Sequence, residues 1–281
     1  MTIIAFQGED GAFSQEAIFE TFGGETQTVA CRTFDEVFRA VETGRANLGM
    51  LPIENSTAGA INQSYDLLLD RDLRIVSEVI FRVRLTLMTP NDMAMADIKR
   101  VYSHPQALAQ SEHYIAAHGW QPIAVYDTAG SARQLAAAPE KDAAAIASET
   151  AARLYGLRVL ERGIEDLHNN HTRFFVIGHD ESPRAEKCKT SIIFATRHTP
   201  GALYACLGHF ASRGINLAKL ESRPDRRRAW HYVFYLDFEG HREDALCRDA
   251  LNDLLGKASF LKVLGSYPAA AIPAEGSASS T

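Results

Sequence analysis

The sequence predicts an α/β protein in which a two-lobed unit of alternating strands and helices precedes a smaller ferredoxin-like unit. Three observations lead to this fold class. Short apolar runs alternate with helical patterns over the first 180 residues, a polar segment follows at 181–189, and a βαββαβ order begins after it. The length of 281 residues also exceeds that of a typical single core.

The first lobe begins with a buried strand at 3–6 and a glycine-containing turn at 8–11. Thr33 and Glu36 have the spacing of a capping box, and the residues after Thr33 carry an apolar stripe of helical period. A long β-rich stretch at 73–88 then crosses towards a second lobe. The other elements expected in this lobe are strands at 26–31 and 48–53 and helices at 14–22 and 62–69.

The second lobe repeats the alternation, and its last helix ends at Gly156. Its expected elements are strands at 101–103, 123–126 and 143–147 and helices at 106–118, 131–138 and 149–155. A further strand at 174–177 returns to the first lobe. We therefore expect one domain at 1–180, with lobes at 1–80 plus 165–180 and at 81–164, and a ligand cleft between the lobes as in periplasmic-binding-protein-like folds.

The C-terminal unit follows a linker at 181–189 and is expected at 190–268. Thr199 and Pro200 predict the N-cap and first position of a helix that ends at Gly214. The other expected elements are strands at 191–196, 215–221, 230–238 and 260–267 and a helix at 243–255. Residues 269–281, rich in Ala, Ser and Pro, are expected to be disordered.

Composition excludes several classes of function. The net charge of −6 opposes binding to nucleic acid, and the basic run at 226–228 is interpreted as a solvated hairpin turn. Residues 1–7 have neither a basic n-region nor an apolar run long enough for a signal peptide or membrane span, so a cytoplasmic protein is expected. The four cysteines are scattered without a C-x-x-C pair, which predicts reduced thiols and no structural metal.

Five segments at predicted strand ends are dense in glycine and in small hydroxyl or amide residues. They lie at 8–14, 52–59, 103–107, 128–131 and 169–174. Ligands of open α/β sheets bind beyond the carboxyl ends of strands, so the five segments predict one anion-binding cleft. Each segment alone also fits an ordinary turn or helix cap. The pair His168-x-x-His171 lacks a third metal ligand.

Together these segments resemble the prephenate dehydratase family. Four motifs carry the resemblance in the family's order and spacing: Gly8-x-x-Gly11-x-Phe13-Ser14, Pro52-Ile53-Glu54-Asn55-Ser56, Ser103-His104-Pro105-Gln106-Ala107 and Thr172-Arg173-Phe174. Two more resemble the phenylalanine-site motifs of the family's ACT regulatory domain: Gly201-Ala202-Leu203 and Glu221-Ser222-Arg223-Pro224. The resemblance covers residues 1 to about 268. Because the first strand starts at Ile3, we expect a monofunctional protein without an upstream chorismate mutase.

The resemblance implies conversion of prephenate to phenylpyruvate, CO2 and water. Formation of the aromatic ring drives this reaction, so neither a cofactor nor a metal is expected. In the family the threonine of the Thr-Arg-Phe motif is tied to catalysis, which implies Thr172 here. An alcohol is too weak an acid to supply the proton alone, and a water or a histidine relay through His104 or His171 is the expected source.

The resemblance also implies a set of residues that contact substrate. They are Phe13, Ser14, Asn55, Ser56, Thr57, Ser103, His104, Gln106, Thr128, Ser131, Arg173 and Phe174. Arg173 could bind a substrate carboxylate through both nitrogens of its guanidinium. On a regular strand, however, Thr172 and Arg173 point to opposite faces, so an internal salt bridge for Arg173 remains an equal alternative.

For the C-terminal unit the resemblance implies an allosteric site for L-phenylalanine between two paired ACT domains. The implied ligand residues are Gly201, Ala202, Leu203, Glu221, Ser222, Arg223 and Pro224. A homo-oligomer, either dimer or tetramer, follows from this pairing. A plain oligomerisation domain is the simpler alternative for this unit. For the whole chain, the alternatives are a non-catalytic sensor of small molecules and the same dehydration carried out on arogenate.

Overall fold

The computed structural model describes residues 2–90, 93–167, 169–225 and 231–271. Contacts between residues divide the chain into two compact units. Within the described ranges, the first unit holds residues up to 64 and from 79 to 174, and the second holds 65–78 and 175–271. Two strands of one sheet run from one unit into the other, so the chain is continuous between them at more than one place.

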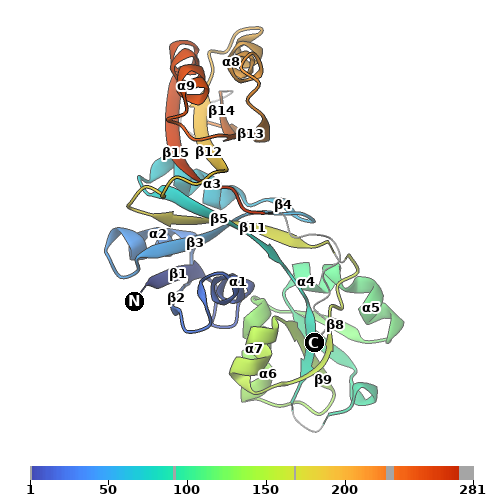
Figure 1. Cartoon of the computed structure of the whole chain (residues 1–281). Helices are drawn as coiled ribbons and strands as arrows, with labels where there is room; N and C mark the ends of the chain where they lie inside the picture. Colours follow the sequence, from blue (N-terminus) through green and yellow to red (C-terminus); the bar gives the residue numbers. More distant parts are fainter. Residues whose placement is uncertain (1, 91–92, 168, 226–230, 272–281) are drawn as a thin grey trace. The chain divides into compact units, whose positions relative to one another are not determined.

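Most of sheet A belongs to the first unit, where it forms one lobe (Figure 1). Its strands are β1 (Ile3–Gln7), β2 (Gln27–Cys31), β3 (Leu48–Asn55), β4 (Gly59–Ala60), β5 (Arg74–Arg82) and β11 (His171–Gly178), accompanied by α1 (Phe13–Phe22), α2 (Phe34–Glu42) and α3 (Asn62–Asp70). The strand order is β2-β1-β3-β11-β5, and β4 pairs with β3. β1 is parallel to both β2 and β3, as the βα alternation predicts.

Sheet B forms the other lobe of the first unit. Its strands are β6 (Thr86–Thr89), β7 (Arg100–Ser103), β8 (Gln121–Ala124), β9 (Ala143–Ala147) and β10 (Arg158–Arg162), with the 3-10 helix η1 (Met95–Asp97) and the helices α4 (Pro105–Gln110), α5 (Glu112–Ala117), α6 (Thr128–Ala137) and α7 (Glu149–Tyr155). The order is β10-β6-β9-β7-β8. β7 is parallel to β8 and β9, whereas β6 is antiparallel to β9 and β10.

The single helix expected at 106–118 is two helices in the structure. The break lies at Ser111, whose φ and ψ of −126° and 25° are not helical. The buried Ser111 hydroxyl donates to the carbonyl of Ala107 four residues earlier, at 2.8 Å. Such a bond from a serine side chain bends or interrupts a helix. The long β-rich stretch expected at 73–88 is likewise two strands, β5 and β6, joined by residues 83–85.

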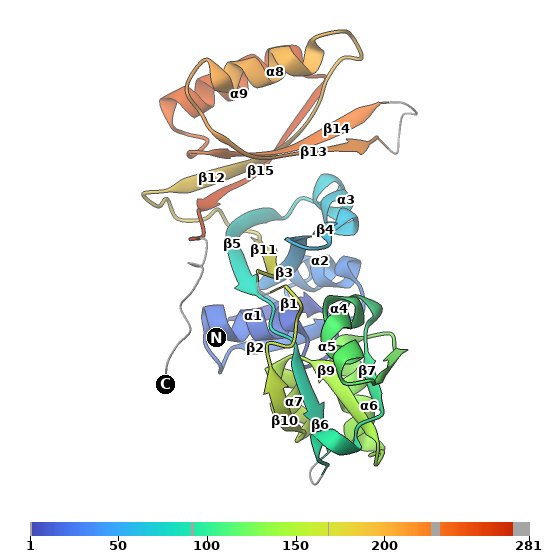
Figure 2. The same cartoon turned by 90° about the vertical axis from the view of Figure 1, so that its right-hand side faces the viewer.

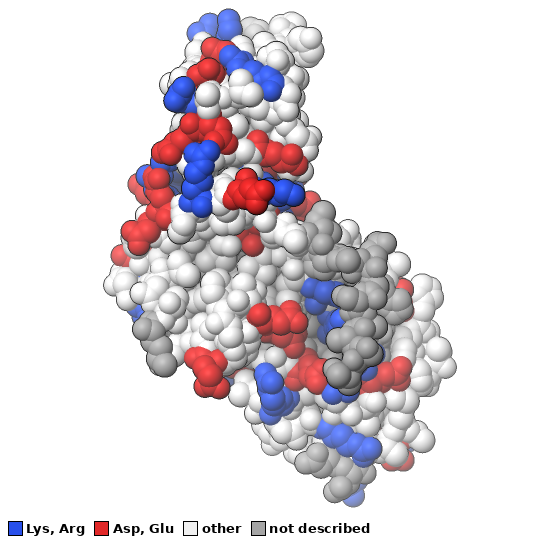
Figure 3. Space-filling view, viewed as in Figure 1, with Lys and Arg blue, Asp and Glu red and all other residues white. Residues whose placement is uncertain are grey.

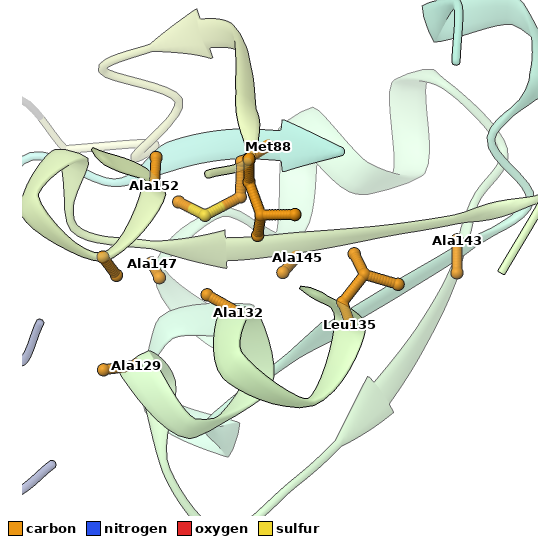
Figure 4. Close-up of a cluster of buried hydrophobic side chains, with 10 residues drawn as sticks. Met88, Ala129, Ala132, Leu135, Ala143, Ala145, Ala147 and Ala152 are labelled. Atoms are coloured by element: carbon orange, nitrogen blue, oxygen red, sulfur yellow. The ribbon is translucent and has the colours of Figure 1, made fainter. Parts of the chain in front are cut away.

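Small side chains fill the core of the sheet B lobe (Figure 4). Ala143, Ala145 and Ala147 of β9 are fully buried and face the helices α6 and α7. Met88 and Leu135 complete the cluster. Alanines let a helix approach a sheet closely, and the dense packing leaves no room for a larger residue.

The turn between β1 and α1 packs against the sheet B lobe. Gly11 has a φ of +87°, and a Cβ at this position would lie 2.8 Å from the Cα of Ala151 in α7. Its carbonyl accepts a hydrogen bond from the buried hydroxyl of Ser148. A glycine is therefore required both by the backbone conformation and by the close approach. The first glycine motif is a turn that joins the lobes.

The predicted cap of α2 differs in one detail. The Thr33 side chain accepts from the N–H of Glu36 at 3.2 Å, as expected. The Glu36 carboxylate, however, accepts from the N–H of Arg32 at 2.9 Å rather than from that of Thr33. The N-terminus of α2 is thus capped by both predicted side chains, with the reciprocal bond displaced by one residue.

The second unit contains a four-stranded antiparallel sheet, sheet C. Its elements are β12 (Cys188–Ala195), α8 (Ala202–Ala211), β13 (Leu217–Pro224), β14 (Tyr232–Glu239), α9 (Ala245–Lys257) and β15 (Phe260–Pro268). The order along the chain is the predicted βαββαβ, and the order in the sheet is β13-β14-β12-β15. Figure 2 shows α8 and α9 side by side over one face of this sheet. Its core includes Phe194, Phe210 and Phe238.

Two boundaries of this unit differ from those expected. β12 begins at Cys188, inside the segment interpreted as a linker, because Cys188 and Lys189 already pair with β14 and β15. α8 begins after Gly201, which has a φ of +78° and occupies the N-cap position assigned to Thr199. The run at 226–228 lies outside the described residues.

The face of sheet C away from its helices packs on residues 65–78 and 175 of the same unit. The Tyr235 hydroxyl donates to the carbonyl of Tyr65 at 2.9 Å, and the two rings make an edge contact. The ring of Phe175 contacts that of Tyr267 with centroids 5.7 Å apart. Both faces of sheet C are therefore covered within the second unit.

Three findings concern the classes of site that the composition argued against. Within the described residues, no helix has the length and apolar character to cross a membrane, and no group of three His, Cys, Asp or Glu side chains could hold a metal. His168 of the weak histidine pair lies outside the described residues. All four cysteines are buried and free. Acidic and basic side chains are interspersed on the face drawn in Figure 3.

Candidate active site

A cleft of about 240 Å³ lies between the two lobes of the first unit. The sheet A lobe and the sheet B lobe both contribute to its lining. The lining residues are Gln7, Gly8, Ala12, Phe13, Ser14, Pro52, Asn55, Ile61, Val83, Leu85, His104, Gln106, Ala107, Gln110, Asp127, Thr128, Ala129, Asn170, Thr172 and Phe174. All five predicted loop segments contribute residues to this lining.

Three helices begin at this cleft: α1, α4 and α6. The N-cap of α1 is Ala12, which has no side-chain oxygen to accept from the first turn. The N–H groups of Phe13 and Ser14 therefore have no capping partner, and they lie at the positive end of the helix dipole. Such a helix start is suited to bind a carboxylate.

The lining is nearly neutral. None of the lining residues is Lys or Arg, and Asp127 is the lining carboxylate. The Asp127 side chain caps α6 by accepting from the N–H of Gly130 at 2.7 Å, which offsets part of its charge. An anionic ligand would be held here by neutral donors and helix N-termini rather than by ion pairs.

Thr172 lies at the centre of a buried polar cluster. Its side chain is 8% exposed, and its Oγ1 accepts a hydrogen bond from Nδ2 of Asn55 at 3.0 Å. Among the described residues, Asn55 is the hydrogen-bond partner of the Thr172 hydroxyl. Because the oxygen accepts from Asn55, the hydroxyl hydrogen is left to point elsewhere, and Thr172 lines the cleft.

The orientation of the Asn55 amide is fixed by its neighbours. Its Oδ1 accepts from the backbone N–H groups of Thr57 and Ala58, both at 3.0 Å. A backbone N–H can only donate, so the atom facing it must be the amide oxygen. The Nδ2 group must then face Thr172, and Asn55 can only donate to it.

A closed ring of four hydrogen bonds connects Asn55 to the sheet B lobe. Gln110 Nε2 donates to Thr57 Oγ1 at 2.8 Å, and Thr57 Oγ1 donates to Asn55 Oδ1 at 2.6 Å. Asn55 Nδ2 donates to Asn170 Oδ1 at 2.8 Å, and Asn170 Nδ2 donates to Gln110 Oε1 at 3.1 Å. Gln110 belongs to α4, whereas the other three residues belong to or adjoin the sheet A lobe.

The two histidines proposed as proton sources have different positions. His104 lines the cleft, and its Nδ1 accepts from the N–H of Gln106 at 3.2 Å. The neutral ring must then carry its hydrogen on Nε2, where it can donate. His171 is not among the lining residues, and its Nδ1 contacts the carbonyl oxygen of Asn169 at 2.9 Å. Of the two histidines, His104 is the one that lines the cleft, and its Nε2–H can donate a hydrogen bond there.

Most of the predicted substrate ligands lie at the cleft. Those that line it are Phe13, Ser14, Asn55, His104, Gln106, Thr128, Thr172 and Phe174. Five others do not line it, namely Ser56, Thr57, Ser103, Ser131 and Arg173. Thr57 is nevertheless a member of the hydrogen-bond ring.

The three predicted serines that do not line the cleft form hydrogen bonds with backbone groups instead. Ser56 donates to the carbonyl of Asn169 and accepts from the N–H of His171. Ser103 is fully buried and donates to the carbonyl of Ile146 at 2.6 Å, which links β7 to β9. Ser131 is 2% exposed and donates to the carbonyl of Thr128 at 2.7 Å. Each of these hydroxyls already donates its hydrogen to a backbone carbonyl, so it cannot donate to a ligand.

Arg173 follows the strand alternation. Thr172 and Phe174 line the cleft on β11, and Arg173 between them does not. Successive side chains of a strand point to opposite faces, so Arg173 is expected on the face of β11 opposite to Thr172 and Phe174. The position disfavours a contact between Arg173 and a ligand in the cleft.

Four polar lining residues were not among the predicted substrate contacts: Gln7, Gln110, Asp127 and Asn170. Gln110 lies four residues after Gln106, on the same face of a helix, and this spacing could have identified it. Asn170 and Asp127 each lie next to a recognised motif. That adjacency is the signal by which they could have been found.

A second hollow, of about 350 Å³, lies at the start of α8 in the second unit. It is lined by Gly201, Ala202 and Leu203 together with Thr196, Arg197, His198, Thr199, Tyr204, His231, Tyr232 and Phe234. The motif Glu221-Ser222-Arg223-Pro224 lies on β13 and does not line it. Within one chain, therefore, only the first of the two predicted phenylalanine motifs reaches this hollow.

Arg223 contacts Asp66. Its Nη2 lies 3.5 Å from Oδ1 of Asp66, and its Nε is buried without a hydrogen-bond partner in the described structure. Asp66 belongs to α3, whose start follows the loop of Asn55 along the chain. The second motif thus contacts α3, the helix that follows the Asn55 loop along the chain.

Comparison with known proteins gives one consistent family. Residues 4–182 match the family model described as prephenate dehydratase. A bifunctional chorismate mutase/prephenate dehydratase of Aquifex aeolicus is 41% identical over 269 residues, which cover 95% of this chain and 74% of that protein. An arogenate dehydratase/prephenate dehydratase of Arabidopsis thaliana is 42% identical, with 94% of this chain and 72% of that protein covered.

Two solved structures are similar over almost the whole chain. A prephenate dehydratase from Arthrobacter aurescens, in complex with L-Phe, is 30% identical, with a TM-score of 0.87 over 95% of this chain and 90% of that one. A structure titled as a novel type of quorum quenching acylase, GqqA, is 37% identical, with a TM-score of 0.89 over 95% of this chain and 98% of that one.

Proposed function

We propose, because this chain belongs to the prephenate dehydratase family, that it converts prephenate to phenylpyruvate, CO2 and water, and that L-phenylalanine inhibits it. The observation that carries the proposal is the buried Thr172 hydroxyl, which accepts from Asn55 and lines the cleft. We assign residues 1–180 to the catalytic domain and 190–268 to an ACT regulatory domain.

The reaction requires that one proton reach the oxygen of the leaving hydroxyl group. The bond between the ring and its carboxylate breaks, the electron pair moves into the ring, and the bond to the hydroxyl on the opposite side breaks. The leaving hydroxyl takes up one proton and departs as water. We expect Thr172 to donate a hydrogen bond to that oxygen as charge develops on it. Such a donor acts most strongly in the transition state.

His104 is our candidate for the residue that orients the water from which the proton comes. It lines the same cleft, and the N–H of Gln106 holds its Nδ1, so Nε2 is the nitrogen that carries hydrogen. A threonine alcohol alone is too weak an acid to protonate the leaving group. We therefore assign the hydrogen bond to the leaving oxygen to Thr172, and we propose that solvent supplies the proton through a water that the Nε2–H of His104 orients by donating a hydrogen bond to it.

The two substrate carboxylates require donors at either end of the cleft. The uncapped start of α1 supplies the N–H groups of Phe13 and Ser14, and Ser14 adds a hydroxyl. Thr128, at the start of α6, supplies another. This arrangement supports recognition of a dianion without a lining arginine or lysine.

Regulation by L-phenylalanine is supported by the hollow at Gly201, Ala202 and Leu203. Strand β11 gives a physical connection to catalysis. Thr172 lies on it in the first unit, and Phe175 lies on it in the second, where its ring contacts that of Tyr267 on β15. A change in the packing of sheet C could therefore shift the strand that presents Thr172.

We propose that two copies pair through sheet C. β13 is an edge strand with alternating exposure, and Leu220 on it is 43% exposed. Tyr204 and Tyr232 at the hollow are also exposed. An edge strand with exposed apolar side chains is a surface that proteins cover, and a second copy would bring its Glu221-Ser222-Arg223-Pro224 motif near such a hollow.

Two other activities are less well supported. The first is dehydration of arogenate, which differs from prephenate by an ammonium group. The relative named arogenate dehydratase/prephenate dehydratase is the reason to consider this substrate. The second is cleavage of an acyl group, which is suggested by the similar structure described as an acylase. Acyl transfer needs a nucleophile activated by a base, and in the described part of the cleft no serine or cysteine is hydrogen-bonded to a histidine.

A direct assay tests the proposed reaction. The purified protein, with a chelator present and no added cofactor, is expected to form phenylpyruvate from prephenate, since aromatisation supplies the driving force. Absorbance of phenylpyruvate measures the rate, and parallel assays with arogenate and with an N-acyl amide measure the alternatives. Loss of turnover with EDTA that a divalent metal restores would contradict the cofactor-free mechanism.

A matched pair of glycine variants tests the regulatory site. Gly201 and Gly214 both have positive φ, and neither has an atom within 4 Å of the position of a Cβ. Leucine at either position carries a similar backbone cost. We expect Gly201→Leu to raise the half-inhibiting phenylalanine concentration about tenfold or more by filling the hollow, and Gly214→Leu to leave it within about twofold. Equal inhibition curves for the two variants would exclude the hollow as the phenylalanine site.

A further inference from the structure

A second large hollow of the first unit, of about 450 Å³, lies outside the catalytic cleft and is rich in arginine. Its basic lining residues are Arg82, Arg84, Arg153 and Arg162, and its acidic ones are Glu16, Glu20 and Glu149. Phe19 and Phe81 add an apolar surface. Four arginines around one hollow are unexpected in a chain with a net charge of −6.

The hollow shares one chain segment with the cleft. Residues 82–86 cross from β5 in the sheet A lobe to β6 in the sheet B lobe. Val83 and Leu85 line the cleft, whereas Arg82, Arg84 and Thr86 line the hollow. This alternation with a period of two places the two sites on opposite faces of the same extended segment. A ligand in one site therefore touches the segment that forms a wall of the other.

Two of the three carboxylates that line the hollow already have hydrogen-bond partners in the protein. Arg162 binds both carboxylate oxygens of Glu149, at 2.8 and 2.7 Å. This hydrogen bonding, together with the nearby charges of Arg162, Arg153 and Arg84, holds the pKa of Glu149 below its ordinary value despite partial burial. The Glu16 carboxylate accepts from the N–H and the hydroxyl of Thr150.

The positive charge is less engaged. Within the described ranges, Arg82, Arg84 and Arg153 form no ion pair with a carboxylate, and the Nε of Arg82 is buried without a hydrogen-bond partner. A buried donor without a partner costs free energy unless a ligand or water satisfies it. In the part of the chain that the structure describes, these three guanidinium groups thus line the hollow without a carboxylate at ion-pair distance, although the charges of Arg153 and Arg84 act on nearby Glu149.

We propose that this hollow binds a small oxyanion with two or more negative charges, a phosphate or a polycarboxylate, and that the occupied site alters the catalytic cleft through residues 82–86. Guanidinium groups match both kinds of oxyanion because they donate two parallel hydrogen bonds. Arg153 belongs to α7 in the sheet B lobe, and Arg82 ends β5 in the sheet A lobe. A ligand held by both would tie the lobes together on the side opposite the cleft.

Binding is tested with the full chain and two probes, inorganic pyrophosphate and citrate, at an ionic strength kept constant with NaCl. Calorimetry and thermal unfolding are expected to show saturable binding of at least one probe, and the probe that binds identifies the ligand as a phosphate or a polycarboxylate. The variant Arg84→Gln/Arg153→Gln changes two exposed side chains and should weaken binding about tenfold or more. Saturable binding of neither probe would overturn the proposal.

A control variant separates a site from general charge. Lys141→Gln/Arg158→Gln removes the same two charges from exposed positions of the sheet B lobe that do not line the hollow. It should bind the probe within about twofold of the unmodified chain. Equal weakening in the two variants would reduce the effect to net charge and overturn the site.

The coupling to the cleft rests on the proposed function, and its test is separate. A saturating probe is expected to change the KM for prephenate at least about twofold, and this response should be lost in Arg84→Gln/Arg153→Gln. If the probe binds but the KM for prephenate does not change, the coupling would be overturned, while the proposed oxyanion site would still stand. If the chain does not turn over prephenate, the calorimetric test of the hollow still stands.

Discussion

Thr172→Ala is expected to lower kcat for prephenate by about 10²–10³ with little change in the free energy of unfolding. The variant removes the one hydroxyl that Asn55 holds at the cleft, at 3.0 Å, while Asn55 keeps Asn170 as an acceptor. The stability cost should therefore be small. Steady-state kinetics and urea unfolding measure the two quantities separately.

Two further variants complete this test. Thr172→Ser keeps the hydroxyl and should retain more activity than Thr172→Ala. Thr43→Ala removes a threonine hydroxyl at the exposed end of α2, where it donates to the carbonyl of Arg39, and should change kcat by less than about twofold. Activity of Thr172→Ala within a few-fold of the unmodified chain would remove Thr172 from the mechanism.

Asn55→Asp is expected to reduce kcat as strongly as the loss of Thr172. The new carboxylate still accepts from the N–H groups of Thr57 and Ala58, but it presents an oxygen where Nδ2 had donated. The Thr172 hydroxyl would then donate to the new carboxylate rather than to substrate, so its hydrogen would be withdrawn from the cleft. The oxygen of Asn170 would face another acceptor.

The same substitution should also destabilise the fold. Asn55 is 6% exposed, and a buried carboxylate opposite an acceptor is expected to cost about 2–4 kcal/mol of unfolding free energy. Urea denaturation measures this cost. Asn62→Asp makes the same chemical change at an exposed position and should leave both kcat and stability nearly unchanged. Full activity in Asn55→Asp would show that the direction of this hydrogen bond does not matter.

Much of the fold could be predicted from the sequence because its signals are local. The cap of α2 at Thr33 and the parallel pairing of β1 follow from residue type and alternation. β10 was missed because its sequence, Arg158–Arg162, is largely charged, as is common for an edge strand. The start of α8 was misplaced because Thr199 and Pro200 resemble a helix start, while the backbone turns at Gly201.

The candidate site was predicted less completely because residue type does not give side-chain direction. Ser103 and Ser131 belong to the correct segments, but their hydroxyls turn inward to backbone carbonyls. Gln110 lies beyond the end of the recognised motif, and its role depends on contacts with Thr57 and Asn170 from the other lobe. Such contacts between distant segments leave no pattern in a single sequence.

The hydrogen-bond ring has a consequence for the catalytic cycle. Within the ring, Gln110 supplies both bonds that join the lobes, so moving α4 away from the Asn55 loop breaks these two and leaves the ring bonds within the sheet A lobe intact. Two neutral hydrogen bonds contribute about 1–3 kcal/mol, a barrier that thermal motion crosses readily. Asn55 continues to hold Thr172 throughout. In the proposed mechanism, product can therefore leave and the next substrate can enter without the Thr172 hydroxyl having to be oriented again in each turnover.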